Sequence, residues 1–221
     1  MKEITIGQRF EMGKQVAEKL DGMDGDAVQL AINSADHPFW FDLVKHFGQK
    51  IKTIFRQLKT IPVFAIGAKP TAECFTNQAR YYHRDGDLDK FLPENQSAQD
   101  ASQFAVCELT ETATFQQMAE SVLGVSGDIQ TLSKLLIQRG HTITLHAIEA
   151  LIERQENGED IGLLTNGWAN FFLVENKDGG VSVVNVDRSA RRWDVHQCSF
   201  GHDCWWIAAF RFFFRNFLVT L

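Results

Sequence analysis

The chain has 221 residues, of which 44% are hydrophobic and 23% charged, and only four are proline. This composition excludes a disordered or low-complexity chain, and the length suffices for one large domain or two small ones with a buried core. The formal net charge of −6 argues against a surface that binds nucleic acid as a whole, so we do not expect nucleic acid as a partner.

Cysteine usage and the two ends of the chain predict the compartment. The N-terminal MKEITIGQRFEMGKQ lacks the apolar run of a secretory signal, so we expect a cytoplasmic protein. Cys74, Cys107, Cys198 and Cys204 are loosely spaced and are expected to be reduced thiols. The C-terminal WWIAAFRFFFRNFLVTL is short for a membrane span, and each of its two arginines would cost about 2.5–3.5 kcal/mol near a bilayer centre. We therefore expect no transmembrane segment.

Residues 1–83 are expected to form a mainly helical region. The strongest pattern lies at 37–59, where apolar residues recur at the i, i+3, i+4 and i+7 positions of one helix face. The charged residues make this helix basic and amphipathic: Lys45, Lys50, Lys52, Arg56 and Lys59 against Asp42. After Pro62, the apolar VFAIG predicts a short buried strand.

The polar and acidic stretch 84–102 is the predicted boundary, as a linker or a surface loop, although the chain can also be one continuous domain. Leu88, Phe91 and Leu92 predict one docked helical turn within it. The remainder, 103–221, is expected to be an α+β domain.

Three helices are predicted after a strand at 103–109. Thr114 begins the first, with Gln117 three residues on in a capping-box pattern. Ser126 opens the second, which Gly140 ends. An amphipathic pattern predicts the third, which ends near Asn157.

From about residue 163 the spacing of apolar residues changes from the period of a helix, 3.6 residues, to that of a strand, two residues. Predicted strands at 169–176, 180–188 and 192–200 are separated by the turn sequences KDGG and SAR, so they form an antiparallel meander. A fourth strand is predicted at 210–216. The predicted fold class is therefore α+β, with N-terminal helices followed by helices packed on a C-terminal antiparallel β-meander.

Residues 192–206, RWDVHQCSFGHDCWW, hold two of the seven histidines and two of the four cysteines. His196, Cys198, His202 and Cys204 are residue types that bind zinc, and the first two share one face of a strand. The spacing H-x-C-x3-H-x-C matches no common zinc module, so small apolar cysteines with surface histidines are the alternative interpretation. Zinc is the one cofactor that the sequence suggests.

Catalytic motifs are absent. The chain contains no GxGxxG, no GxxxxGK, no HExxH and no GxSxG, so no catalytic residue is assigned. This favours a protein without catalytic activity and leaves an enzyme open as the alternative. Basic and aromatic side chains are the candidate binding residues: Lys45, Lys50, Lys52, Arg56, Trp168, Trp193, Trp205 and Trp206.

Several segments in the second half of the chain are similar to a recurring module. HAIEALIERQENGEDIGLLTNGWANFFLVENKDGGVSVVNV, then RRWDV, then FRFFFRN resemble the C-terminal "LLTNG…FxV…DG…FxRN" module of uncharacterised short proteins from candidate phyla radiation (Patescibacteria) genomes. YYHRDGDLDKFLP resembles a segment upstream in those proteins, and the likeness covers roughly residues 80–217. The resemblance implies no activity and no functional residue.

These patterns favour a non-catalytic interaction or structural module that binds an unknown protein partner or itself. A zinc-binding protein or metal-dependent enzyme that uses the cluster at 196–204 is one alternative. Binding of an anionic polymer or surface by the basic helix 37–59 is the other.

Overall fold

The computed structural model describes residues 54–189, 191–199 and 206–216. Its strands are β1 (Phe55–Val63), β2 (Lys69–Pro70), β3 (Tyr81–Arg84), β4 (Asn95–Gln96), β5 (Ser102–Leu109), β6 (Asn170–Glu175), β7 (Val181–Ser189), β8 (Arg192–Ser199) and β9 (Arg211–Arg215). Its helices are the 3₁₀ helix η1 (Thr71–Glu73) and the α-helices α4 (Asp87–Phe91), α5 (Phe115–Leu123), α6 (Ile129–Gln138) and α7 (Leu145–Glu156). The predicted α+β class is confirmed. Residues 1–53 of the predicted N-terminal helical region lie outside these ranges, and its described part, 54–83, contains strands β1, β2 and β3 and only one 3₁₀ turn, so a mainly helical region is wrong there.

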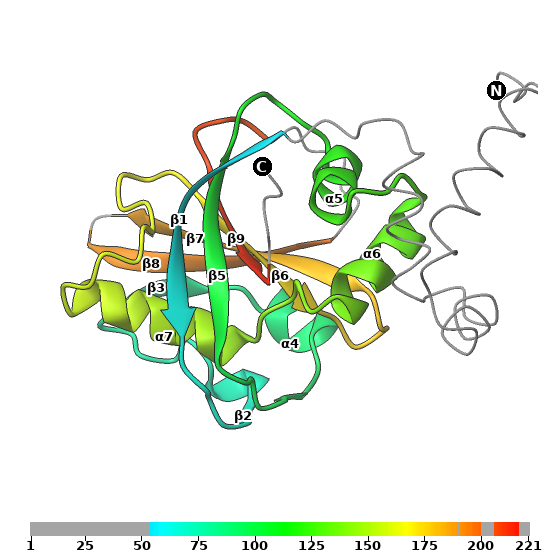
Figure 1. Cartoon of the computed structure of the whole chain (residues 1–221). Coiled ribbons are helices and arrows are strands. Elements are labelled where there is room, and N and C mark those ends of the chain that lie inside the picture. Colours follow the sequence, from blue (N-terminus) through cyan, green and yellow to red (C-terminus); the bar gives the residue numbers. More distant parts are fainter. Residues whose placement is uncertain (1–53, 190, 200–205, 217–221) are drawn as a thin grey trace, which may run out of the picture. The chain divides into compact units, whose positions relative to one another are not determined.

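Seven strands form one sheet in the order β1-β5-β9-β6-β7-β8-β3, and β2 pairs with β4 separately. The sheet is strongly twisted, so that β1 and β5 cross the direction of β7 and β8 (Figure 1). Strands β6, β7 and β8 are consecutive antiparallel neighbours, which confirms the predicted meander. Strand β9 does not extend it but lies between β5 and β6, antiparallel to β5 and parallel to β6.

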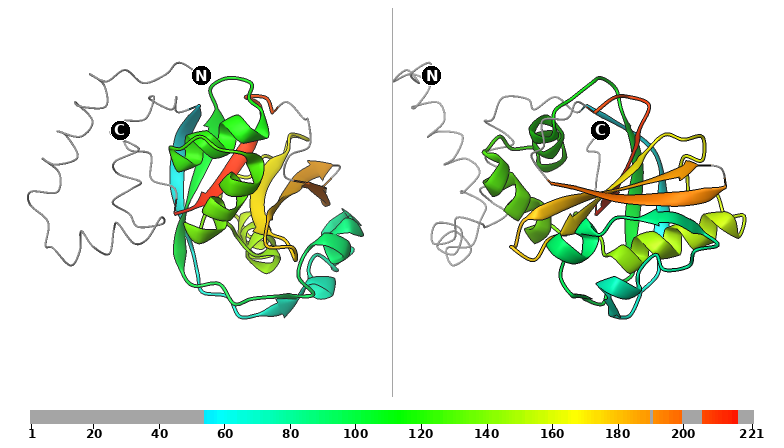
Figure 2. Two further views of the ribbon diagram at one scale, coloured as in Figure 1. Left: turned by 90° about the vertical axis from the view of Figure 1, so that its right-hand side faces the viewer. Right: turned by 180° about the vertical axis from the view of Figure 1, so that it is seen from behind.

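Each face of the sheet carries its own hydrophobic core. We call the two sides the α7 face and the α5 face; α7 lies below strands β7 and β8 and α5 above them in the view from behind (Figure 2). The α7-face core includes Ile148, Leu151, Ile152, Phe172, Val184, Val186, Trp193, Val195 and Phe213. The α5-face core includes Met118, Leu132, Leu136, Phe171, Leu173, Val181, Val183, Phe212 and Phe214. Because strand side chains alternate, neighbouring residues of β6, β7 and β9 enter opposite cores.

Helix ends agree with the sequence except at one position. Thr114 Oγ1 accepts a hydrogen bond from Gln117 N at 3.3 Å, and Gln117 Oε1 accepts one from Thr114 N at 2.8 Å, so the predicted capping box is confirmed. Helix α6 begins at Ile129 and not near Ser126, because the Asp128 carboxylate accepts hydrogen bonds from two first-turn N–H groups. No helix in the described ranges is long and apolar enough to cross a membrane.

The prediction of one helix over 37–59 is wrong for its last residues, because Phe55 to Lys59 belong to strand β1. Residues 54–63 alternate between buried and exposed positions, and they pair with β5. An irregularity between Gln57 and Lys59 places Phe55 in the α5-face core and Ile61 in the α7-face core. A short apolar pattern fits the period of a helix as well as that of a strand, and here pairing with β5 selects the strand. Residues 37–53 lie outside the described ranges.

The segment 84–102 holds the end of β3 together with α4 and β4. Leu88 and Leu92 are buried, in agreement with the predicted docked helical turn. Strands from both sides of this segment join the same sheet, since β1 pairs with β5 and β3 pairs with β8.

Candidate functional site

A polar patch occupies the α5 face where β7, β8 and β3 extend beyond the apolar core. It consists of His83, Asn185, Asp187, Asp194 and His196. The sheet register places Asp187 opposite Asp194, and Asn185 opposite His196. His83 of β3 is the partner of Asp194 on the other side of β8. Three strands therefore bring five polar side chains together, although they are up to 113 positions apart in the chain (196 − 83).

Two histidines form one side of this patch. The His83 and His196 rings stack with their centroids 4.9 Å apart and their planes 28° apart. Asp85 lies near both rings, and its carboxylate accepts hydrogen bonds from Asp87 N at 2.9 Å and Gln197 N at 3.2 Å. Partial burial acts to raise the pKa of Asp85, but these two N–H groups and the neighbouring histidines outweigh it and lower the pKa. Asp85 thus stays ionised and ties β3 and α4 to β8.

The facing carboxylates form the other side. Partial burial, followed by the charge of Asp194, raises the pKa of Asp187, and His196 only partly opposes this. Asp194 Oδ1 and Asn185 Oδ1 are buried and lack a hydrogen-bond partner within the described residues. The patch itself contains no lysine and no arginine, so it presents acceptors without a matching cation.

An aromatic cluster adjoins the polar patch. Phe171 of β6 is the cross-strand partner of Asn185, and its ring packs edge-on against Trp206 at 4.2 Å between centroids and against Phe210 at 5.1 Å. Trp168 extends the cluster toward the surface and meets Phe210 at 5.9 Å. We define the aromatic cluster as Trp168, Phe171, Trp206 and Phe210. The polar patch and the aromatic cluster are therefore neighbours on the sheet, and they meet where Phe171 pairs with Asn185.

The predicted zinc ligands are only partly placed. His196 and Cys198 lie on the same face of β8, as alternation requires, but Cys198 packs against the apolar α5-face core while His196 stacks on His83. His202 and Cys204 lie outside the described residues. Within the described ranges no three histidine, cysteine, aspartate or glutamate side chains are grouped to hold a metal ion. The zinc site stays a prediction.

The four candidate tryptophans have different surroundings. Trp168 is 44% exposed, whereas Trp206 is buried in the aromatic cluster. Trp193 is 0% exposed, and its indole N–H donates to Glu156 Oε1 at 3.0 Å. The prediction of Trp193 as a binding residue is therefore wrong, because its side chain belongs to the α7-face core. Glu156 supplies the hydrogen-bond acceptor that a buried indole N–H needs. Trp205 lies outside the described residues.

Only one of the predicted basic binding residues lies in the described part of the chain. Arg56 is on strand β1, where its guanidinium pairs with Glu108 on β5, so it is not part of a basic helix face in this structure. Lys45, Lys50 and Lys52 lie outside the described residues.

The LLTNG sequence is fixed by two side-chain amides. Gln155 donates to Leu163 O at 2.7 Å and accepts from Leu163 N at 2.8 Å. Asn170 accepts from Leu164 N at 2.7 Å and donates to Leu164 O and Val186 O. Because each amide bonds a backbone N–H and C=O together, this motif builds the loop that leads into β6.

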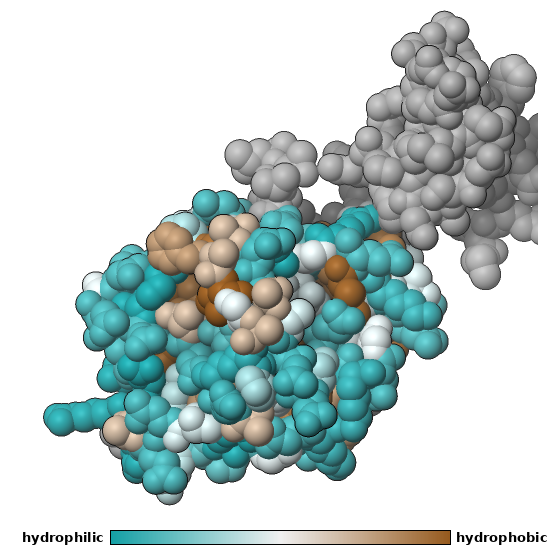
Figure 3. Space-filling view, turned by 90° about the horizontal axis from the view of Figure 1, so that it is seen from below, coloured by the Kyte–Doolittle hydropathy of each residue, from teal (hydrophilic) through white to brown (hydrophobic). Residues whose placement is uncertain are grey.

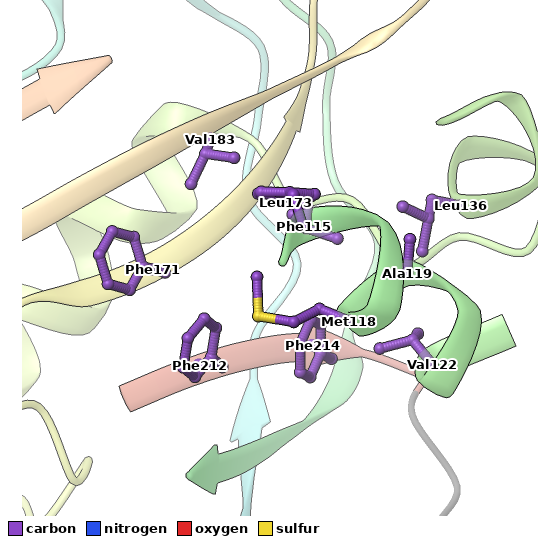
Figure 4. Close-up of a pocket in the computed structure, with 10 residues that line it drawn as sticks. All are labelled: Phe115, Met118, Ala119, Val122, Leu136, Phe171, Leu173, Val183, Phe212 and Phe214. Carbon is purple, nitrogen blue, oxygen red and sulfur yellow. The ribbon is translucent and has the colours of Figure 1, made fainter. Parts of the chain in front are cut away.

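Figure 4 shows a gap between α5 and the sheet that ten apolar side chains line. They are Phe115, Met118, Ala119, Val122, Leu136, Phe171, Leu173, Val183, Phe212 and Phe214. Its free volume is about 10 Å³, which is the space of a single water molecule. An apolar void of this size is a packing defect of the core and not a ligand site.

Apolar residues also reach the outer surface. Among the described residues, the exposed large hydrophobic side chains are Leu58, Phe64, Tyr82 and Trp168. The side of the molecule seen from below is mostly hydrophilic, with its largest group of hydrophobic residues toward the upper left and a smaller one farther right (Figure 3). Such grouping is common where another molecule binds.

The sequence prediction missed the facing carboxylates. Asn185, Asp187, Asp194 and His196 stand at alternate positions of two predicted strands, which was a visible signal. Only the strand register, however, shows that Asp187 and Asp194 are opposite each other.

No protein-family model, no curated protein and no solved structure matches the chain.

Proposed function

We propose that this protein is a non-catalytic interaction module whose polar patch binds a basic side chain of a protein partner. The observation that carries the proposal is the pairing of Asp187 with Asp194 on neighbouring strands. Like charges directly opposite each other destabilise a sheet, and a cation between them turns repulsion into attraction. Burial, and then the charge of Asp194, raises the pKa of Asp187, so a cation bound between the two carboxylates would favour the ionised form of Asp187.

The hydrogen-bonding groups of the patch favour the same kind of ligand. Asp194 Oδ1 and Asn185 Oδ1 are acceptors without a donor within the described residues. Ammonium and guanidinium groups carry only donors, so either would satisfy these atoms. A guanidinium can in addition bond two oxygens at once through its planar fork.

The aromatic cluster favours a long basic side chain as the ligand rather than a free metal or ammonium ion. Arginine and lysine carry apolar stems that pack on hydrophobic surfaces, and a guanidinium also stacks on aromatic rings. Trp168 and Phe210 offer such a surface beside the patch, and Trp168 is exposed. The aromatic rings would contact the stem while the carboxylates contact the charged end.

A cytoplasmic location accords with this proposal. Cys74 and Cys107 are buried as free thiols, which fits a reducing compartment.

The experiment is a calorimetric titration of the full chain with a hexa-arginine peptide at low and at physiological salt. We expect saturable binding that weakens about tenfold or more in both Asp187→Asn and Asp194→Asn, since each removes half of the facing pair. Asp178→Asn is the matched control, because Asp178 lies exposed in the turn before β7 and the substitution changes the net charge equally.

Two results would overturn the proposal. One is the absence of binding at low salt. The other is an equal loss of affinity in the Asp178→Asn control, since that would show attraction to the overall negative charge and not to the polar patch.

A further inference from the structure

A second site is suggested by a polar cleft at the end of the sheet where β6 and β9 stop. Its volume is about 390 Å³, which is within the range of small-molecule sites. The wall is made by the segment 93–99, which includes β4, by the loop between α6 and α7, and by the ends of β6 and β9. Its polar residues include Gln99, Thr144, Glu175 and Arg215.

Two buried glutamines shape this cleft and cap α7. Gln96 Oε1 accepts from Leu145 N at 3.2 Å, and Gln99 Oε1 accepts from Thr144 N at 3.0 Å. These bonds satisfy two of the free N–H groups at the N-terminus of a 12-residue helix, whose N-cap side chain makes no capping bond. The positive end of the α7 dipole therefore points toward the wall of the cleft.

Gln99 is left with an unused donor. Gln99 is only 3% exposed, and its Nε2 has no hydrogen-bond partner within the described residues. The amide cannot simply be reversed, because its oxygen must face Thr144 N. A buried N–H group without an acceptor costs about 1–3 kcal/mol. Because Gln99 is one of the residues that line the cleft, an acceptor bound beside it would offset this cost.

Arg215 adds a positive charge to the same cleft. Its Nε is buried without a partner, and no ion pair of its guanidinium occurs within the described residues. The Arg215 backbone is held in place, since its carbonyl oxygen lies 2.8 Å from His141 Nδ1. Glu175 is the one carboxylate among the described lining residues, and it is exposed.

From these groups we infer that the cleft binds a small oxyanion, the carboxylate or phosphate group of a small molecule. Arg215 supplies charge, Gln99 Nε2 supplies a directed donor, and the N-terminus of α7 supplies a favourable dipole. Helix N-termini and arginine are the usual partners of such groups in proteins. This site lies apart from the polar patch and takes a ligand of the opposite charge.

The test is a titration of the full chain with sodium acetate and, separately, sodium phosphate, with sodium chloride at equal ionic strength as the reference. The readouts are the side-chain amide signals of Gln99 and the backbone amide of Thr144 in ¹H–¹⁵N spectra. We expect saturable shifts of both signals with at least one oxyanion, at a Kd of about 10 mM or tighter. A response to one anion and not the other identifies the group that the cleft prefers.

Arg215→Gln should weaken this binding about tenfold, whereas Arg192→Gln should leave it unchanged. Arg192 is an exposed arginine of β8 outside the cleft, so it controls for the loss of one positive charge. The inference is overturned if neither oxyanion shifts the Gln99 and Thr144 signals more than chloride does. It is equally overturned if both arginine variants weaken binding to the same extent.

Discussion

Asp187 on β7 lies directly opposite Asp194 on β8. The next pair on the same face is Asn185 and His196, where Phe171 is the partner of Asn185 on β6 and the His196 ring stacks on His83. A half-buried sheet position next to an apolar core would normally hold a β-branched or aromatic residue. The two carboxylates are therefore a local cost to stability, and binding at this position is the function that we propose for them.

Asp187→Asn should stabilise the protein at neutral pH. The pKa of Asp187 is raised by burial and by Asp194, so the ionised form is disfavoured in the folded state. Protonated Asp187 therefore stabilises the folded state. This contribution is fully present below the pKa that Asp187 has in the unfolded chain, and it is lost as the pH rises through the pKa of Asp187 in the folded state. We expect a gain of roughly 0.2–1 kcal/mol in the free energy of unfolding at pH 7 that disappears below about pH 3.9. Urea denaturation at both pH values measures it, and a loss of stability at pH 7 would contradict it.

Asp85→Asn should have the opposite sign. Burial raises the pKa of Asp85, but hydrogen bonds from Asp87 N and Gln197 N outweigh burial and lower it. The contribution of Asp85 is present above its unfolded pKa and is lost as the pH falls. The variant should lose about 1 kcal/mol at pH 7, and the difference should narrow in acid. Asp100→Asn is the control, because Asp100 is exposed, and an equal loss there would refute the assignment.

Thiol reactivity should distinguish the cysteines. Burial raises the pKa of Cys74 to about 11 and that of Cys107 to about 12, so neither forms a thiolate near neutral pH. We expect iodoacetamide to leave both unmodified in the native protein and to modify both in denaturant, as read by peptide mass spectrometry. Rapid native labelling of Cys107 would contradict the burial of β5 between two cores.

The capping box of α5 gives a prediction about local stability. Thr114→Ala removes the acceptor for Gln117 N and should lower the free energy of unfolding by about 1 kcal/mol. Thr165→Ala is the control, because Thr165 is exposed in the loop before β6. Thermal denaturation of both variants measures the difference, and equal stability of the two would show that the cap is not formed.

Local signals explain which parts of this fold were predictable. The Thr114 capping box and the positions of strands β6, β7 and β8 depend on residues close in sequence, and they are confirmed. The two faces of β6 do not alternate between buried and exposed, because both faces enter a core. Strand β1 was misassigned because its apolar spacing fits a helix until β5 pairs with it.

Long-range register explains the rest. The placement of β9 between β5 and β6, and of Asp187 opposite Asp194, depends on pairings between segments far apart in the chain. No local pattern contains that information. Part of the candidate site is nonetheless visible in the sequence, since His196 is a predicted zinc ligand and Trp168 and Trp206 are predicted binding residues.

The most direct test of the proposed function follows the side-chain carboxyl ¹³C signals of Asp187 and Asp194 while argininamide is added to the full chain. Our account predicts that both signals shift together along one saturable curve, and that the pKa of Asp187 falls when the ligand is bound, because a cation between the carboxylates favours their ionised form. The exposed Asp178 signal serves as the internal reference. Signals of Asp187 and Asp194 that move no more than that of Asp178, or a pKa of Asp187 that argininamide leaves unchanged, would contradict the account.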